Sequence, residues 1–178
     1  MGTENFYEKI YGKYNVKFTD AETDRYLNRI GLTRAEVSLD REGLNKLQRS
    51  HLWSVPFENI DLFDYDRPVD FGTAEVFDKI VNKNRGGYCF ELNAALMLLI
   101  EALGFTVHAA GARIVIPDNP EELPMPLTHR ASIVTIDGKR YYCDVGFGMT
   151  TAPLIPVCLD ERDEQDIAGD IFTVEDRP

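Results

Sequence analysis

The segment Arg85-Gly86-Gly87-Tyr88-Cys89-Phe90-Glu91-Leu92-Asn93 joins a glycine break to a cysteine that opens an apolar run. The run continues to Leu103 and is followed by Gly104, which predicts one helix that begins at Cys89 and ends at a glycine. Unpaired amides and aligned peptide dipoles at a helix N-terminus stabilise an anion, and they lower the pKa of a thiol placed there. Free cysteines are also common as small core residues, so this segment alone leaves both interpretations open.

Composition restricts the classes of partner. The 178 residues carry a net charge of −11, which disfavours nucleic acid and anionic membrane surfaces as partners. An anionic substrate would then need a local basic group, for which Arg85 is the first candidate. The three cysteines, Cys89, Cys143 and Cys158, are an odd number without metal-ligand spacing, which indicates a reducing compartment and no metal site. The chain begins without a leader pattern and has no bilayer-spanning run, so we expect a soluble cytoplasmic protein.

The order of secondary-structure signals predicts an α+β protein with two domains, a helical domain over 1–104 and a β domain over 105–178. Helix starts are expected at Thr19 or Asp20, at Thr33 with Glu36, at Asp40, at Thr73 and at Cys89. Strands are expected over 105–116, where Gly111 allows a bend, and over 131–136, 139–145, 152–157 and 171–174. The intervening segments predict a proline-rich acidic loop over 117–126 and a solvated acidic stretch over 160–170.

One predicted hairpin brings a base and an acid together. The dipeptide Asp137-Gly138 between two β-branched runs is typical of a type I′ turn. If these residues form the turn, the register places Asp144 opposite Ala131 and makes His129 its diagonal neighbour on the same face. Such neighbours lie about 7–8 Å apart, which an imidazole–carboxylate hydrogen bond can bridge. The hairpin therefore predicts a His129–Asp144 pair, with a capping role before the following glycines as the alternative for Asp144.

A catalytic triad follows when the cysteine is added to this pair. Asp144 would orient His129, His129 would take the proton of Cys89, and Cys89 would attack a carbonyl carbon. Amides at the start of the cysteine helix would receive the developing oxyanion. The other two histidines are expected to be structural: His51 lies on an apolar helix face, and His108 lies on a strand without a nearby carboxylate.

These residues resemble the arylamine N-acetyltransferase family from about Phe18 to the C-terminus. The spacing fits as well, because His129 follows Cys89 by 40 residues and Asp144 follows His129 by 15. Six segments carry the resemblance in order, namely Val55-Pro56-Phe57-Glu58-Asn59, Arg85 to Asn93, Gly111-Ala112-Arg113, Thr128-His129-Arg130, Asp144-Val145-Gly146-Phe147-Gly148 and Thr151-Ala152-Pro153-Leu154.

The resemblance implies a cysteine-proteinase-like core, in which an N-terminal helical bundle precedes an antiparallel β-barrel. It makes Cys89, His129 and Asp144 the counterparts of the family's catalytic triad. The family transfers an acetyl group from acetyl-coenzyme A, by a ping-pong reaction through a cysteine thioester, to the nitrogen of an arylamine, arylhydroxylamine or hydrazine. Xenobiotic metabolism is the family's usual setting, and its acyl donor is a cosubstrate that needs no metal.

The same comparison assigns substrate-binding positions. Phe147 matches a position that lines the acceptor pocket, and Phe57 lies in a motif that packs beside the site. Arg85 matches the family's arginine before the glycines, where it either faces substrate or pairs with an acid such as Glu58.

The family pattern also implies further barrel strands and an α/β lid domain after residue 178. We therefore expect an incomplete barrel whose edge strand over 171–174 invites self-association, and a catalytic fragment with reduced activity. The alternatives are a cysteine acyltransferase or hydrolase that uses another acyl donor, of the amide synthase, papain or transglutaminase type, and an inactive interaction module. Acetylation of the cysteine, competition between acyl donors and thiol reactivity distinguish these functions.

Overall fold

The computed structural model describes residues 16–67, 69, 71–115, 127–148 and 152–176. Its helical elements are α2 (Asp20–Arg29), the 3-10 turn η1 (Arg34–Glu36), α3 (Arg41–Ser54), α4 (Ile60–Phe63), α5 (Thr73–Phe77), the π-helical turn η2 (Asp78–Asn82) and α6 (Cys89–Leu103). Its strands are β1 (Thr106–Ala112), β2 (His129–Ile136), β3 (Lys139–Cys143), β4 (Val157–Cys158), β5 (Gln165–Ile167) and β6 (Asp170–Phe172).

Capping side chains set the helix starts as the sequence predicts. Thr19 and Glu22 form a reciprocal capping box at α2, in which the Glu22 carboxylate accepts from the Thr19 amide at 2.8 Å. The Asp40 carboxylate accepts from the Gly43 amide at 2.9 Å and caps α3. The predicted capping box at Thr33 is also present, but it caps only the single turn η1.

The helix predicted from Thr73 begins there but is not a regular α-helix. The Thr73 hydroxyl donates to the Val16 carbonyl oxygen at 3.1 Å. It therefore binds the segment before α2 and does not cap the first amides of α5. After Phe77 the backbone continues as the π-helical turn η2 to Asn82. π-Helices are rare, and single π-helical turns within α-helices frequently occur at functional sites.

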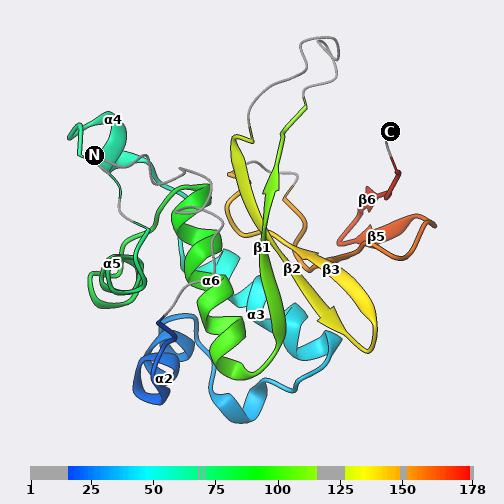
Figure 1. Cartoon of the computed structure of the whole chain (residues 1–178), viewed down its shortest axis with the longest axis horizontal. Coiled ribbons are helices and arrows are strands. Elements are labelled where there is room, and N and C mark those ends of the chain that lie inside the picture. Colours follow the sequence, from blue (N-terminus) through cyan, green and yellow to red (C-terminus); the bar gives the residue numbers. More distant parts are fainter. Residues whose placement is uncertain (1–15, 68, 70, 116–126, 149–151, 177–178) are drawn as a thin grey trace.

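Helix α6 is the centre of the fold (Figure 1). Strands β1 and β2 pack against it on one side, and α2, α3 and α5 contact it elsewhere. Every residue from Phe90 to Ile100 is buried, which explains the nearly continuous apolar run. Gly104 ends the helix in the left-handed conformation with φ 106°, as predicted from its position. No helix in the described residues is long and apolar enough to cross a membrane.

The main sheet is antiparallel, with strand order β1-β2-β3-β4. The predicted hairpin is confirmed, because Asp137 and Gly138 have φ values of 49° and 78° and Ile136 pairs with Lys139. The described strands form an open sheet and not a closed barrel. The sequence therefore predicts both the helical layer and the incomplete β layer correctly.

The boundaries of two predicted strands are wrong. Strand β1 ends at Ala112, and the pairing register continues through Gly111, which lies opposite Arg130. The strand expected over 152–157 is reduced to the two residues of β4. Two prolines, Pro153 and Pro156, precede β4, and neither has the amide that a sheet ladder requires.

The C-terminal region also differs from the prediction. The stretch 171–174, expected as a barrel strand, contributes to β6, which pairs with β5 in a separate two-stranded sheet. The stretch 160–170 is not simply solvated, because Gln165 and Ile167 are buried. The Gln165 side chain joins the β5–β6 hairpin to β4. Its Oε1 atom accepts from the Cys158 backbone amide, and its Nε2 atom donates to the Cys158 carbonyl oxygen, both at 2.8 Å. The predicted acidic loop over 117–126 lies outside the described residues.

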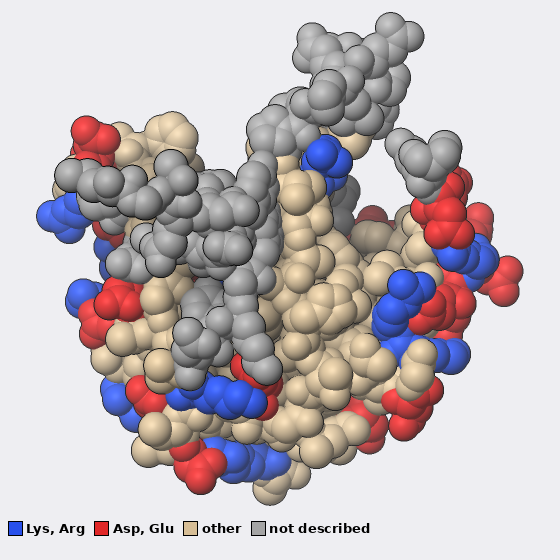
Figure 2. Space-filling view, viewed as in Figure 1, with Lys and Arg blue, Asp and Glu red and all other residues tan. Residues whose placement is uncertain are grey.

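Charged side chains gather around the margin of the face shown in Figure 2, whereas the centre over the main sheet is mostly uncharged. Where β3 begins, Arg140 pairs with Asp160 at 2.6 Å and Lys139 pairs with Glu161 at 3.0 Å. The division into domains 1–104 and 105–178 stays a prediction, since α6 of the first packs directly on β1 and β2 of the second.

The central position of α6 predicts its contribution to stability. Leu99 is fully buried in α6, and Leu99→Ala should lower the free energy of unfolding by about 2–5 kcal/mol because it leaves a cavity. Leu39 is 61% exposed, so the same truncation there should cost about 0.5 kcal/mol or less. Urea unfolding followed by circular dichroism measures both variants, and equal losses would contradict the assigned core.

Candidate active site

The two glycines before Cys89 are required by a close approach of two chain segments. Gly87 forms an isolated bridge with Phe57, and its carbonyl oxygen accepts from the Glu58 amide at 2.9 Å. A Cβ atom on Gly86 would lie 1.9 Å from the Pro56 carbonyl oxygen, far inside contact distance. The glycine break thus lets the Pro56 segment lie directly against the chain that leads into α6.

An ion-pair network holds this arrangement in place. The Lys79 ammonium lies 2.7 Å from the Glu91 carboxylate and 2.8 Å from Asp61. The Arg85 guanidinium lies 2.8 Å from Asp61 and 2.7 Å from Glu58. Hydrogen bonds from Arg85 and then Lys79 lower the pKa of Asp61 to about 2. Arg85 therefore pairs with acids, as one of its two predicted roles required.

Glu91 connects the network to the first turn of α6. Its carboxylate accepts from the Tyr88 amide at 3.1 Å and closes a capping box at the helix start. Burial raises the pKa of Glu91, and the hydrogen bond from Lys79 opposes that effect. The helix that carries Cys89 is thereby fixed at its N-terminus by a buried acid.

The structure brings Cys89, His129 and Asp144 together. His129 is the first residue of β2, Asp144 directly follows β3, and the His129 Nε2 atom lies 2.7 Å from Asp144 Oδ2. The imidazole also hydrogen-bonds the Cys89 side chain. Burial alone would lower the pKa of His129, but the bonds to Asp144 and Cys89 outweigh it and raise that pKa to about 9. The pairing predicted from hairpin register is present, and the start of α6 meets its face.

The Asp144 carboxylate is buried and accepts four hydrogen bonds. Oδ1 accepts from Asn93 Nδ2 at 2.8 Å and from the Gly146 amide at 2.9 Å. Oδ2 accepts from His129 and, at 2.8 Å, from the Tyr142 hydroxyl. Burial would raise the pKa of this carboxyl, but the hydrogen bonds, led by that of His129, hold it below its usual value. Asp144 is thus ionised and available to stabilise an imidazolium.

Asn93 is a supporting residue that sequence reasoning left without a role. Its Nδ2 atom also donates to the Arg130 carbonyl oxygen at 2.6 Å, and its Oδ1 atom accepts from the Val145 amide at 2.9 Å. Asn93 follows Cys89 by four residues, which places both side chains on one helix face. That spacing was the available signal.

Gln48 of α3 is a second residue without an assigned role. Its Oε1 atom accepts from the Asp144 amide at 3.2 Å, and its Nε2 atom donates to the Pro153 carbonyl oxygen at 2.7 Å. A glutamine 96 residues from its partner has no local sequence signal.

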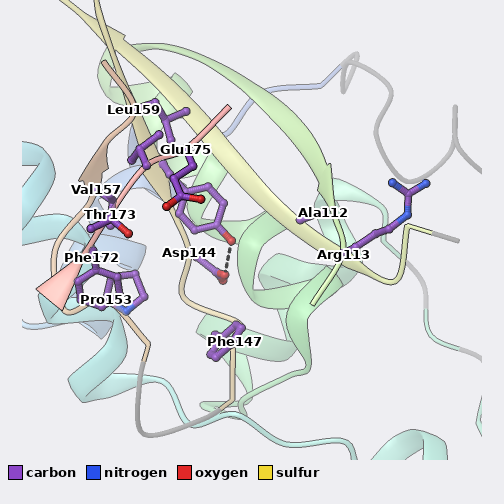
Figure 3. Close-up of a pocket in the computed structure, with 12 residues that line it drawn as sticks. Ala112, Arg113, Asp144, Phe147, Pro153, Val157, Leu159, Phe172, Thr173 and Glu175 are labelled. Atoms are coloured by element: carbon purple, nitrogen blue, oxygen red, sulfur yellow. Dashed lines mark hydrogen bonds between the residues drawn. The ribbon is translucent and has the colours of Figure 1, made fainter. Parts of the chain in front are cut away.

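The predicted substrate positions separate in the structure. Phe147 lies edge-on to the His129 ring, with centroids 6.1 Å apart, and it lines an open cavity of about 710 Å³ beside Asp144 (Figure 3). Phe57 is 44% exposed and packs at Gly148, outside that lining. The full lining is Ala112, Arg113, Tyr142, Asp144, Phe147, Pro153, Val157, Leu159, Phe172, Thr173, Val174 and Glu175.

The remaining histidines and cysteines have other environments. His51 is buried and bonded to the Tyr26 hydroxyl at 2.9 Å, and burial lowers the pKa of His51 to about 3. His108 lies on β1 and is exposed. Cys143 and Cys158 are buried, and burial raises the pKa of the Cys143 thiol. Over the described residues, no group of three or more histidine, cysteine or acidic side chains could hold a metal ion.

The raised pKa of His129 predicts a pH dependence of stability. This pKa is higher in the folded protein than the ordinary 6.5, so protonation of His129 stabilises the folded state. That contribution to the free energy of unfolding is complete below about pH 6.5 and is lost as pH rises through about 9. The stability difference between wild type and His129→Gln should therefore shrink from about pH 6 to pH 9.5. Urea titrations across this range measure it, with His108→Gln as the control; a difference that grows with pH would contradict the assignment.

The contact between Gly146 and α6 gives a second prediction. A Cβ on Gly146 would lie 2.5 Å from the Cys89 Cα atom, so Gly146→Ala should displace the cysteine, slow its alkylation about tenfold or more, and cost about 1–3 kcal/mol. Gly31→Ala is the control, because Gly31 has φ 75° and a Cβ added there would meet no atom within 4 Å. It should strain the backbone locally and leave the cysteine in place. Unchanged alkylation of Cys89 in Gly146→Ala would refute the contact.

Comparison with known proteins agrees with this geometry. A family described as N-acetyltransferase matches residues 40–178. The arylamine N-acetyltransferase 2 of Macaca mulatta is 30% identical over 151 residues, which are 85% of this chain and 51% of that protein. The chain spans about half the length of the curated relatives it matches.

Solved structures give the same result. The arylamine N-acetyltransferase of Salmonella typhimurium superimposes with a TM-score of 0.78 at 28% identity, over 88% of this chain and 55% of that one. The Mycobacterium marinum enzyme in complex with CoA gives 0.75 at 32% identity, with 85% and 56% covered. These neighbours confirm the predicted α+β class with a cysteine-proteinase-like core. The chain belongs to the arylamine N-acetyltransferase family.

Proposed function

We propose that this chain carries the acetyl-accepting site of an arylamine N-acetyltransferase. Acetyl-coenzyme A would donate its acetyl group to Cys89, and the thioester would then pass it to the nitrogen of an arylamine, arylhydroxylamine or hydrazine. The observation that carries the proposal is the convergence of Cys89, His129 and Asp144, with the pKa of His129 raised to about 9. An imidazole of that basicity is protonated at neutral pH and stabilises a thiolate beside it.

The first half-reaction follows from these positions. The Cys89 thiolate attacks the carbonyl carbon of the acetyl thioester, and the negative charge moves to the carbonyl oxygen near the first amides of α6. Collapse of this intermediate breaks the bond to the coenzyme A sulfur, and His129 gives its proton to that leaving thiolate. Asp144 stabilises the imidazolium before the transfer and holds the ring in place after it.

The second half-reaction reverses the roles. The acceptor nitrogen attacks the Cys89 thioester, its proton passes to His129, and the Cys89 thiolate leaves. Phe147 supports an aromatic acceptor, because its ring lines the cavity beside His129 and most of that cavity's lining is apolar. The CoA complex of the Mycobacterium marinum relative supports coenzyme A as the donor's carrier.

We place the protein in the cytoplasm and in xenobiotic metabolism by its family, with Phe57 supporting the acceptor site from outside. We also propose self-association through the open sheet edge.

The proposal predicts a covalent intermediate. Incubation with acetyl-coenzyme A should add one acetyl group to the wild-type protein, and peptide mapping should place it at Cys89. His129→Gln should slow this acylation by about a hundredfold or more, because the thiol loses its base. Subsequent addition of an arylamine should release the acetyl group as the N-acetyl product. Intact-protein mass spectrometry measures each step.

Two cysteine variants complete the experiment. Cys89→Ala should accept no acetyl group, whereas Cys158→Ala, which alters a buried thiol outside the site, should behave as wild type. A folded wild-type protein that forms no thioester would refute the proposal. Faster acylation by a donor other than acetyl-coenzyme A would favour the amide synthase or transglutaminase alternative, and a Cys89 thiol no more reactive than a denatured one would favour the inactive module.

A further inference from the structure

The Tyr142 hydroxyl shares an acceptor atom with the catalytic histidine. It donates to Asp144 Oδ2 at 2.8 Å, and His129 Nε2 lies 2.7 Å from the same oxygen. The other oxygen, Oδ1, has its own two donors from Asn93 and the Gly146 amide. Tyr142 is therefore the donor that competes with His129 for the charge on Oδ2.

The position of Tyr142 follows from strand geometry. Tyr142 lies on β3 and precedes Asp144 by two residues, so their side chains share one face. Its ring lines the same cavity as Asp144 and Phe147, and the dashed line at Asp144 in Figure 3 marks its hydrogen bond. Its neighbour Tyr141 points into the hydrophobic core instead.

We infer that Tyr142 is a positioning residue that sets the basicity of His129 through their common acceptor, Asp144 Oδ2. This role deepens the proposed function, because it rests on His129 acting as the base of Cys89. The hydroxyl fixes the carboxylate and takes part of its negative charge, so Asp144 stabilises the imidazolium less than an oxygen bonded to His129 alone would. The imidazolium then gives its proton to a leaving thiolate more readily.

The surroundings keep Tyr142 a donor. Burial and then the charge of Asp144 raise the pKa of Tyr142, so its hydroxyl stays protonated throughout the working pH range. The titratable groups that bear on the His129 ring are Cys89 from α6, with Asp144 and Tyr142 from the end of β3. Two charged residues, Arg113 and Glu175, line the cavity beside them.

Tyr142→Phe tests the inference because it removes only the hydroxyl. With one donor gone, Asp144 Oδ2 should bind His129 more strongly, and the pKa of His129 should rise by about half to one unit, a roughly three- to tenfold change in proton affinity. Nuclear magnetic resonance of histidine-labelled protein measures this titration without any acyl donor. Transfer of the proton to coenzyme A should slow by a similar factor.

Tyr141→Phe is the matched control. It removes a hydroxyl from the adjacent residue of β3, keeps the ring that the Arg41 guanidinium covers, and does not touch Asp144. It should leave the His129 titration unchanged. As a second measurement, incorporation of 3-fluorotyrosine makes the hydroxyl a stronger donor, so it should lower the pKa of His129 in wild type and not in Tyr142→Phe.

The outcomes separate this inference from the proposed function. An unchanged or lowered pKa of His129 in folded Tyr142→Phe would overturn the role of Tyr142, even if wild-type Cys89 is acetylated normally. A raised pKa in a protein whose Cys89 takes no acetyl group would support the positioning role and reject the acetyl transfer. If Tyr142→Phe does not fold, the absence of any fluorotyrosine effect on His129 in the wild type overturns the inference.

Discussion

The buried carboxylate of Asp144 is the interaction on which the rest of the site depends. An ionised acid without partners is very costly in a protein interior, and here four donors from α6, β2, β3 and the following loop satisfy it. Because the donors come from separate elements, the charge can be accommodated only when the helix and the hairpin are correctly docked. The same bonds that offset the cost of burial therefore assemble the candidate active site. Displacement of any one of these elements therefore removes a donor from a buried charge.

A second constraint acts on the other side of Cys89. Gly86 and Gly87 permit the Pro56 segment to lie against the chain before α6, and Glu91 with Lys79 fixes the helix start. Cys89 thus lies between two close contacts. One joins Gly86 and Gly87 to the Pro56 segment, and in the other Gly146 packs against the Cα atom of Cys89. Small residues at both contacts are thus a requirement of packing around the one cysteine, of the three, that is not buried.

Short-range rules predicted what depends on neighbouring residues. The caps at Thr19 and Asp40, the turn at Asp137-Gly138 and the His129–Asp144 pair all follow from spacing within one element or one hairpin. The prediction failed where distant contacts decide. Residues 171–174 had the composition of a barrel strand, but Gln165 binds both backbone groups of Cys158 and draws that region into a separate hairpin. Gln48 beneath Asp144 is a partner of the same long-range kind and had no sequence signal.

The candidate triad and the cavity beside it are formed mostly by different segments of the chain. The proposed triad and the side chains that bond Asp144 lie between residues 48 and 144, so the proposed acylation of Cys89 would rely on the helices and the first hairpin. Most of the cavity wall instead comes from residues 153–175, around β4 and at the end of the β5–β6 hairpin. The proposed triad and most of the cavity wall thus come from different parts of the chain, and Asp144, Tyr142 and Phe147 lie where the two parts meet. On the proposed function, substitutions at residues 157–175 should change which amine is accepted while leaving thioester formation intact, because the four donors to the Asp144 carboxylate all precede this segment.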